Sequence, residues 1–128
     1  MIEFSDDIDL EELRYMSEYI LMIMIAFHSY TQKNGLPCRI TSTTEAVQGR
    51  KEKTHAQGRA FDASSRGFSS GEIFSLLRHF NTTYPHIAAI SSKTGKKTLV
   101  TYHKMEDGEY HFHFQVRWID GAHYVGKK

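Results

Sequence analysis

The sequence predicts an α+β domain in which a small antiparallel sheet is flanked by helices. Three observations carry this prediction: an apolar stripe with helical spacing near the start, a helix-capping motif in the middle, and strand-like segments in the second half. A chain of 128 residues has the size of one domain and can bury a hydrophobic core. We therefore assign residues 1–128 to a single domain.

A long first helix is predicted from apolar residues spaced three and four apart. Acidic residues between positions 6 and 12 lie at its start, where the helix dipole favours negative charge, and Asn34, Gly35 and Pro37 end it. We interpret the stripe as core packing rather than as a cofactor site. It consists of Leu13, Met16, Ile20, Ile23, Phe27 and Tyr30.

A short strand is predicted over residues 39–43, followed by a polar loop up to His55. A second helix is expected to begin at Ser69, because Ser69 and Glu72 have the spacing of a capping box before an apolar run. It should end before Tyr84, because the proline that follows disfavours helical backbone in the preceding residue.

The second half of the chain predicts three strands joined as a meander, at residues 87–91, 98–102 and 110–118. Successive side chains of a strand point to opposite faces, so the last strand has an apolar face and a polar face. The apolar face, which belongs in the core, carries Tyr110, Phe112, Phe114 and Val116. The polar face carries Glu109, His111, His113, Gln115 and Arg117. This face is either a solvent-exposed ribbon or a metal-binding surface, and we favour the second interpretation.

Composition excludes several classes of protein. The formal net charge of +1 gives no field that would draw the whole chain to nucleic acid, and Cys38, the single cysteine, excludes an intramolecular disulfide and a zinc site built on thiolates. The most apolar run, residues 20–27, is far shorter than the roughly 20 residues that cross a bilayer. The acidic start lacks the basic residues of a secretory signal. We expect a soluble protein made in the cytoplasm and not inserted in a membrane.

Three side chains predict a hydrolytic zinc site. His55, Asp62 and His113 supply two imidazoles and a carboxylate, a ligand set that leaves one coordination position for water. Gly58 would let the backbone bend between the first two ligands, and small Ala60 would leave room beneath the metal.

His111 lies on the same strand face as His113, about 6.6–6.8 Å further along the strand. This position suits a general base or a group that stabilises an oxyanion. We interpret the other histidines as surface or core residues: His28, His79, His86, His103 and His123.

The segment from His55 to Asp62, His-x-x-Gly-x-Ala-x-Asp, resembles the signature of the D-Ala-D-Ala metallopeptidases, which include phage endolysins and carboxypeptidases. The His111-Phe-His113 segment is similar to the His-x-His strand of murein endopeptidases and lysostaphin-type enzymes. These enzymes and the hedgehog zinc domain form one superfamily, and the resemblance covers roughly residues 39–118. It implies a hedgehog/DD-peptidase-like fold, zinc ligated by His55, Asp62 and His113, and His111 as the catalytic histidine.

The chain departs from the family pattern near the substrate. Many members carry Ser-Gly-Tyr-Arg after the first strand, and the arginine helps to hold a substrate carboxylate. Residues 42–45 here are Ser-Thr-Thr-Glu. This difference favours endopeptidase over carboxypeptidase action. Arg59 and Glu109 are candidate accessory residues, the first as a substitute for the missing arginine and the second as a base.

The resemblance implies a zinc peptidase that cleaves bonds next to D-amino acids in peptidoglycan stem peptides, as a phage lysis protein or virion component acting on the cell wall. Two alternatives stay open. A domain of this fold could bind zinc without catalysis, because fold does not fix function. A His-hydrophobic-His strand also occurs in nucleases that open single-stranded DNA with a tyrosine, and Tyr102, Tyr110 and Tyr124 are available.

Overall fold

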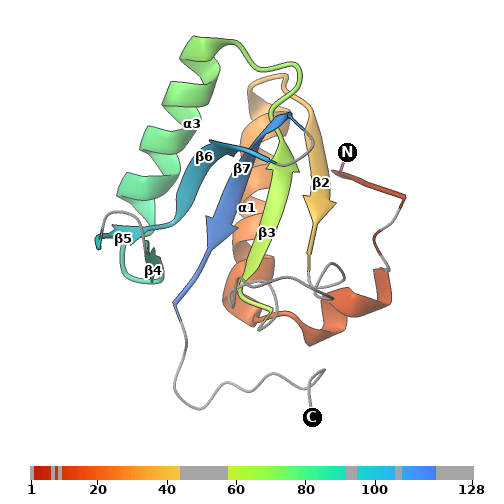
Figure 1. Cartoon of the computed structure of the whole chain (residues 1–128), viewed down its shortest axis with the longest axis vertical. Coiled ribbons are helices and arrows are strands. Elements are labelled where there is room, and N and C mark those ends of the chain that lie inside the picture. The colour runs from red at the N-terminus through yellow and green to blue at the C-terminus, as the bar shows by residue number, and fades with distance from the viewer. Residues whose placement is uncertain are drawn as a thin grey trace.

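The computed structural model describes residues 2–6, 8, 10–43, 58–91, 95–105 and 108–117. Within this part of the chain the architecture is α+β, as predicted: two α-helices, a five-stranded sheet and a separate two-stranded sheet (Figure 1).

The main sheet is mixed rather than purely antiparallel. Its strand order is β1-β2-β3-β7-β6, and only the β1–β2 pair is parallel. The prediction of an antiparallel sheet missed β1, which adds along the edge of β2 through backbone bonds such as Ser5 N to Ile40 O, at 2.9 Å. The strands are β1 (Ile2–Phe4), β2 (Cys38–Ser42), β3 (Ala60–Ser64), β6 (Val100–Lys104) and β7 (Tyr110–Gln115).

The predicted three-strand meander is wrong in part. Strands β6 and β7 do form a hairpin, but the segment before them leaves the main sheet. There β4 (Ala89–Ile90) pairs with β5 (Lys97–Thr98) as a small sheet of its own. The side of β7 opposite β6 pairs with β3, which comes from much earlier in the chain, and Ala88 forms an isolated bridge with Val116 just after β7.

The first predicted helix is divided in two. A 3-10 helix, η1 (Leu10–Tyr15), precedes α1 (Glu18–Lys33). The division falls at Ser17, whose hydroxyl accepts a hydrogen bond from Tyr19 N at 3.1 Å and so caps a new helix. The predicted end is confirmed, with Asn34 as C-cap and Gly35 at a φ of 67°.

The capping box predicted for the second helix is also confirmed. In α3 (Ser70–Thr83), the Ser69 hydroxyl accepts from Glu72 N, and the Glu72 carboxylate accepts from Ser69 N. Among the described residues, no helix is long and apolar enough to cross a membrane.

The core lies between the two helices and one face of the main sheet. Phe27 of α1 is fully buried, and its ring meets those of Phe61 on β3, Phe80 on α3 and Phe114 on β7 at centroid distances of 5.0–6.5 Å. Figure 1 shows α1 running behind β3 and β7. Because Phe61, Phe112 and Phe114 face the helices, their alternate neighbours on β3 and β7 face the other way. This arrangement creates the polar face on which the candidate site lies.

Candidate zinc site

The polar face is organised in rows by the register of three strands. Asp62 of β3 is opposite His113 of β7, and Ser64 is opposite His111 in the next row. Ser42 of β2 continues the first row beyond Asp62. Residues opposite each other on neighbouring strands share a face, so the pairing brings Asp62 and both β7 histidines together.

Asp62 and His113 are in direct contact. The Oδ1 atom of Asp62 lies 2.9 Å from Nδ1 of His113, although 51 residues separate them in the chain. Asp62 is 1% exposed and His113 is 5% exposed, and the second carboxylate oxygen, Oδ2, is buried as well. Burial of a charged carboxylate is costly unless a cation or hydrogen-bond donors compensate it, so positive charge at His113 or at a bound cation would stabilise this pair.

The contact at the other ring nitrogen of His113, Nε2, bears on where the ring carries its proton. Gln115 Nε2 donates to the carbonyl of Thr98 at 3.3 Å, which turns Oε1 of the same amide toward Nε2 of His113, 3.1 Å away. Since Oε1 can only accept, Nε2 of His113 carries a proton. A neutral His113 would then present a lone pair at Nδ1 to the Asp62 carboxylate. A proton on Nδ1, a proton on the Asp62 carboxyl, or a cation between the two groups would each satisfy the contact.

The two described donors, Asp62 and His113, have the chemistry of two ligands of a zinc site. Zinc-bound imidazoles commonly donate their second N–H to an oxygen, and Oε1 of Gln115 would be that oxygen for His113. Ligands about 2.0–2.2 Å from a tetrahedral zinc lie roughly 3.3 Å apart, so the Asp62–His113 pair would have to open by only a few tenths of an ångström.

The third predicted ligand, His55, lies outside the described residues. Within the described ranges, no group of three or more His, Cys, Asp or Glu side chains could hold a metal ion. Two features of the predicted motif do lie in this part. Gly58 has a φ of 68°, the left-handed conformation expected for a bend that needs glycine, and Ala60 is fully buried.

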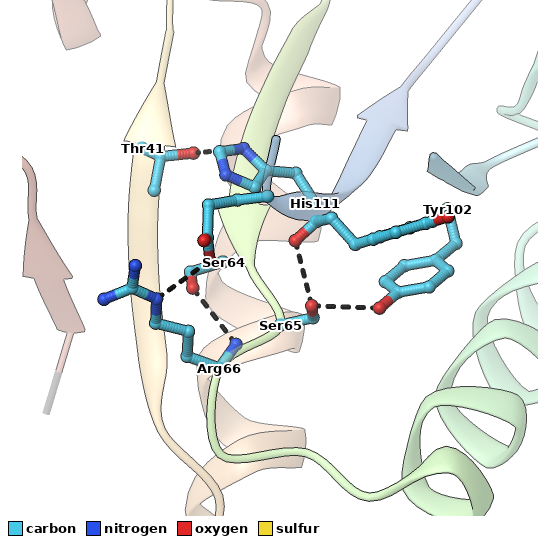
Figure 2. A network of polar contacts seen from close by, with 8 residues as sticks. Thr41, Ser64, Ser65, Arg66, Tyr102 and His111 are labelled. Carbon is cyan, nitrogen blue, oxygen red and sulfur yellow. Dashed lines mark hydrogen bonds and ion pairs between the residues drawn. The ribbon is translucent and has the colours of Figure 1, made fainter. Parts of the chain in front are cut away.

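The ring of His111 is restrained by a contact with a residue of β2. Its Nδ1 lies 3.3 Å from the hydroxyl of Thr41, and Figure 2 shows the two side chains facing each other. His111 is half-buried, one row further along than His113. A restrained, partly exposed imidazole beside the buried pair is suitable for proton transfer to or from a bound molecule.

The two candidate accessory residues have different surroundings. The Glu109 carboxylate pairs with Nε of Arg66 at 3.0 Å at the start of β7, two residues from His111. Arg59 donates from Nη1 to the carbonyl of Val116 at 2.8 Å, and burial lowers the pKa of its guanidinium. The Arg59 contact supports the strand end, and its role toward a substrate stays a prediction.

Three residues of this face were given no functional role by the sequence, although Gln115 was placed on the polar face of the last strand. Gln115 and Thr41 orient His113 and His111, and His103 of β6 has its ring centroid 5.9 Å from that of His113. His103 had been assigned to the surface or core. The sequence could have indicated His103, because two strands that fold back on each other about a turn at Gly108 pair His103 with His111. Thr41 and Gln115 had no such signal, since side chains of their type are common on strands.

Two of the three tyrosines named for the nuclease alternative, Tyr102 and Tyr110, belong to the face of the sheet opposite His111 and His113. Tyr102 is opposite Phe112 in the register, and its ring stacks on Tyr110 at 5.2 Å. Its hydroxyl is 3.1 Å from that of Ser65 (Figure 2). Tyr124 lies outside the described residues. Neither described tyrosine shares the face of His111 and His113, which disfavours a tyrosine nucleophile there.

Comparison of the chain with protein-family models, curated proteins and solved structures gives no match.

Proposed function

We propose that this protein is a zinc-dependent peptidase that hydrolyses bonds next to D-amino acids in the peptide part of peptidoglycan. The observation that carries the proposal is the buried Asp62–His113 pair, in which Gln115 leaves Nδ1 directed at a carboxylate. The resemblance of residues 55–62 and 111–113 to D-Ala-D-Ala metallopeptidases supplies the substrate class.

In this proposal Asp62 and His113, with His55, would hold the metal. When bound, zinc would supply an acidified water and a positive charge for the developing oxyanion. Gln115 keeps His113 in the tautomer that presents Nδ1. His111, restrained by Thr41, accepts the proton of the attacking water and passes it to the leaving amine. Glu109 and Arg66 border the position of the substrate chain on the His111 side.

The test combines metal analysis with mass spectrometry of digested peptidoglycan. The wild-type chain should bind about one zinc ion and release peptides cut beside a D-residue, and a chelator should abolish the cleavage. His111→Ala should keep the metal and lose turnover by about 100-fold or more, the scale of a lost general base. Asp62→Ala should lose the metal itself.

Each result can overturn a part of the proposal. A fully active His111→Ala variant would remove the catalytic role of His111, and a zinc-replete Asp62→Ala variant would remove the ligand set. A wild-type chain that binds zinc yet cuts nothing would make this a non-catalytic zinc-binding module. Circular dichroism of both variants serves as the control for folding.

A further inference from the structure

A groove of about 470 Å³ begins at His111 and extends away from the Asp62–His113 row toward the edge strand β1. Its volume falls in the range of small-molecule and peptide sites. The groove crosses β1, β2, the end of β3 and the start of β7, so the polar face of the sheet forms its floor. A chain bound there would reach the proposed catalytic histidine without touching the buried ligand pair.

Four charged side chains line this groove, and they are of both signs. Arg39 pairs with Glu3 at 4.0 Å, and Arg66 pairs with Glu109 at 3.0 Å. Figure 2 shows Arg66 extending over β2 on the side where Thr41 and His111 lie. The side chains of Glu3 and Arg66 are largely exposed, and those of Arg39 and Glu109 are partly exposed, so both ion pairs are in contact with solvent and are held weakly. A bound molecule can therefore exchange partners with them at little cost.

The two positive and two negative side chains of the groove favour one class of ligand. Two carboxylates would repel a phosphate backbone, and two guanidinium groups would repel a polycation. A ligand with both a carboxylate and an amine can satisfy both kinds of partner, the carboxylate through the planar fork of an arginine. Stem peptides that contain a diamino acid can carry both groups.

We propose that the groove binds a zwitterionic peptide segment, with a free carboxylate and a free amine, on one side of the bond that His111 helps to break. This inference rests on the proposed peptidase function. It names Arg39 and Arg66 as residues that recognise the substrate carboxylate, and Glu3 and Glu109 as those that recognise the amine.

The test uses the zinc-loaded full chain and short stem peptides that lack the scissile bond, so that binding is measured without turnover. Calorimetry compares a peptide with both groups free with versions in which the carboxylate is amidated, the amine is acetylated, or both are blocked. Each single block should weaken binding about tenfold, as expected for a lost charge-assisted contact.

Variants assign the effect to the groove. In the double variant Arg39→Gln/Arg66→Gln, the free and amidated carboxylates should bind equally well. The matched control is Arg14→Gln, because Arg14 is an exposed arginine paired with Glu11 at 3.1 Å outside the groove, and it should keep the preference. Both arginines of the double variant are in contact with solvent, so the fold should be retained.

Equal binding of all four peptides, or an unchanged preference in the double variant, overturns the groove assignment even if peptidoglycan is cleaved. Selective binding that the double variant loses supports the groove even if no cleavage occurs, and in that case it is the peptidase function that fails.

Discussion

The chemistry of His113 depends on which of its two nitrogens carries the proton. The amide of Gln115 settles this, because its own N–H group is held by the Thr98 carbonyl and its oxygen is left for His113. The Asp62 carboxylate then lies beside Nδ1, which is the only ring nitrogen of a neutral His113 with a free lone pair. At the scale of single residues, the candidate site is therefore defined by Gln115 as much as by the two proposed ligands.

Replacing Gln115 with leucine tests this role. Gln115→Leu should lower zinc affinity about 10- to 100-fold, because a ligand histidine without its outer hydrogen bond is free to reorient. Competition with a chromogenic chelator measures the affinity. Gln115→Glu, which retains an acceptor oxygen for Nε2 of His113 but loses the donor to Thr98, is the matched control and should bind zinc more tightly than the leucine variant. Equal affinity of the leucine variant would show that Gln115 does not orient the ligand.

At the scale of elements, the β3–β7 register forms the site. A shift by one residue would turn His113 toward the helices and Phe112 or Phe114 toward the polar face. The buried phenylalanines on both strands prevent that shift, so hydrophobic burial on one face fixes the polar rows on the other. The helices contribute by covering the apolar face, and their ends are set by local caps.

The cap of α3 gives a prediction for this element. Ser69→Ala should lower the free energy of unfolding by about 1 kcal/mol, because Glu72 N loses its acceptor at the helix start. Urea denaturation measures the loss. Ser75→Ala, at an exposed position inside α3, is the control and should change stability by less than about 0.5 kcal/mol. Equal effects of the two substitutions would contradict the capping box.

On the scale of the whole molecule, one aromatic cluster joins both helices to the sheet. Phe27 is its centre, with ring contacts to β3, β7 and α3, and the Phe61 and Phe114 rings stack at 4.6 Å. The polar face lies on the other side of the same strands. The stability of the cluster and the geometry of the candidate site are therefore coupled through β3 and β7.

Truncation of Phe27 tests how much the aromatic cluster contributes to the stability of the fold. Phe27→Ala should cost about 3–5 kcal/mol of unfolding free energy through the cavity it leaves, and Phe27→Leu should cost less. Phe74→Ala is the control, because Phe74 is a phenylalanine of α3 that is 67% exposed. Thermal unfolding followed by circular dichroism ranks the three variants. A Phe74→Ala variant as unstable as Phe27→Ala would place the core elsewhere.

Local sequence signals predicted several parts of the fold. The capping box of α3, the end of α1 at Asn34 and the apolar face of the last strand depend on residues a few positions apart. The first two are confirmed, and on the last strand the burial of Phe112, Phe114 and Val116 is confirmed, whereas Tyr110, predicted in the core, is 48% exposed. The first helix was predicted too long, because its apolar stripe continues through Met16 although Ser17 starts a new helix. An amphipathic pattern reports which face is buried and does not report where the backbone is capped.

The sequence by itself determined the helices, the two-faced last strand and the candidate residues Asp62, His111 and His113. Only the tertiary structure decided that β1 joins β2 in parallel, that β3 pairs with the side of β7 opposite β6, and that Gln115 and Thr41 orient the two histidines. The physical reason is distance along the chain. Capping and amphipathicity act between near neighbours, whereas strand order and register depend on how distant segments share one buried face.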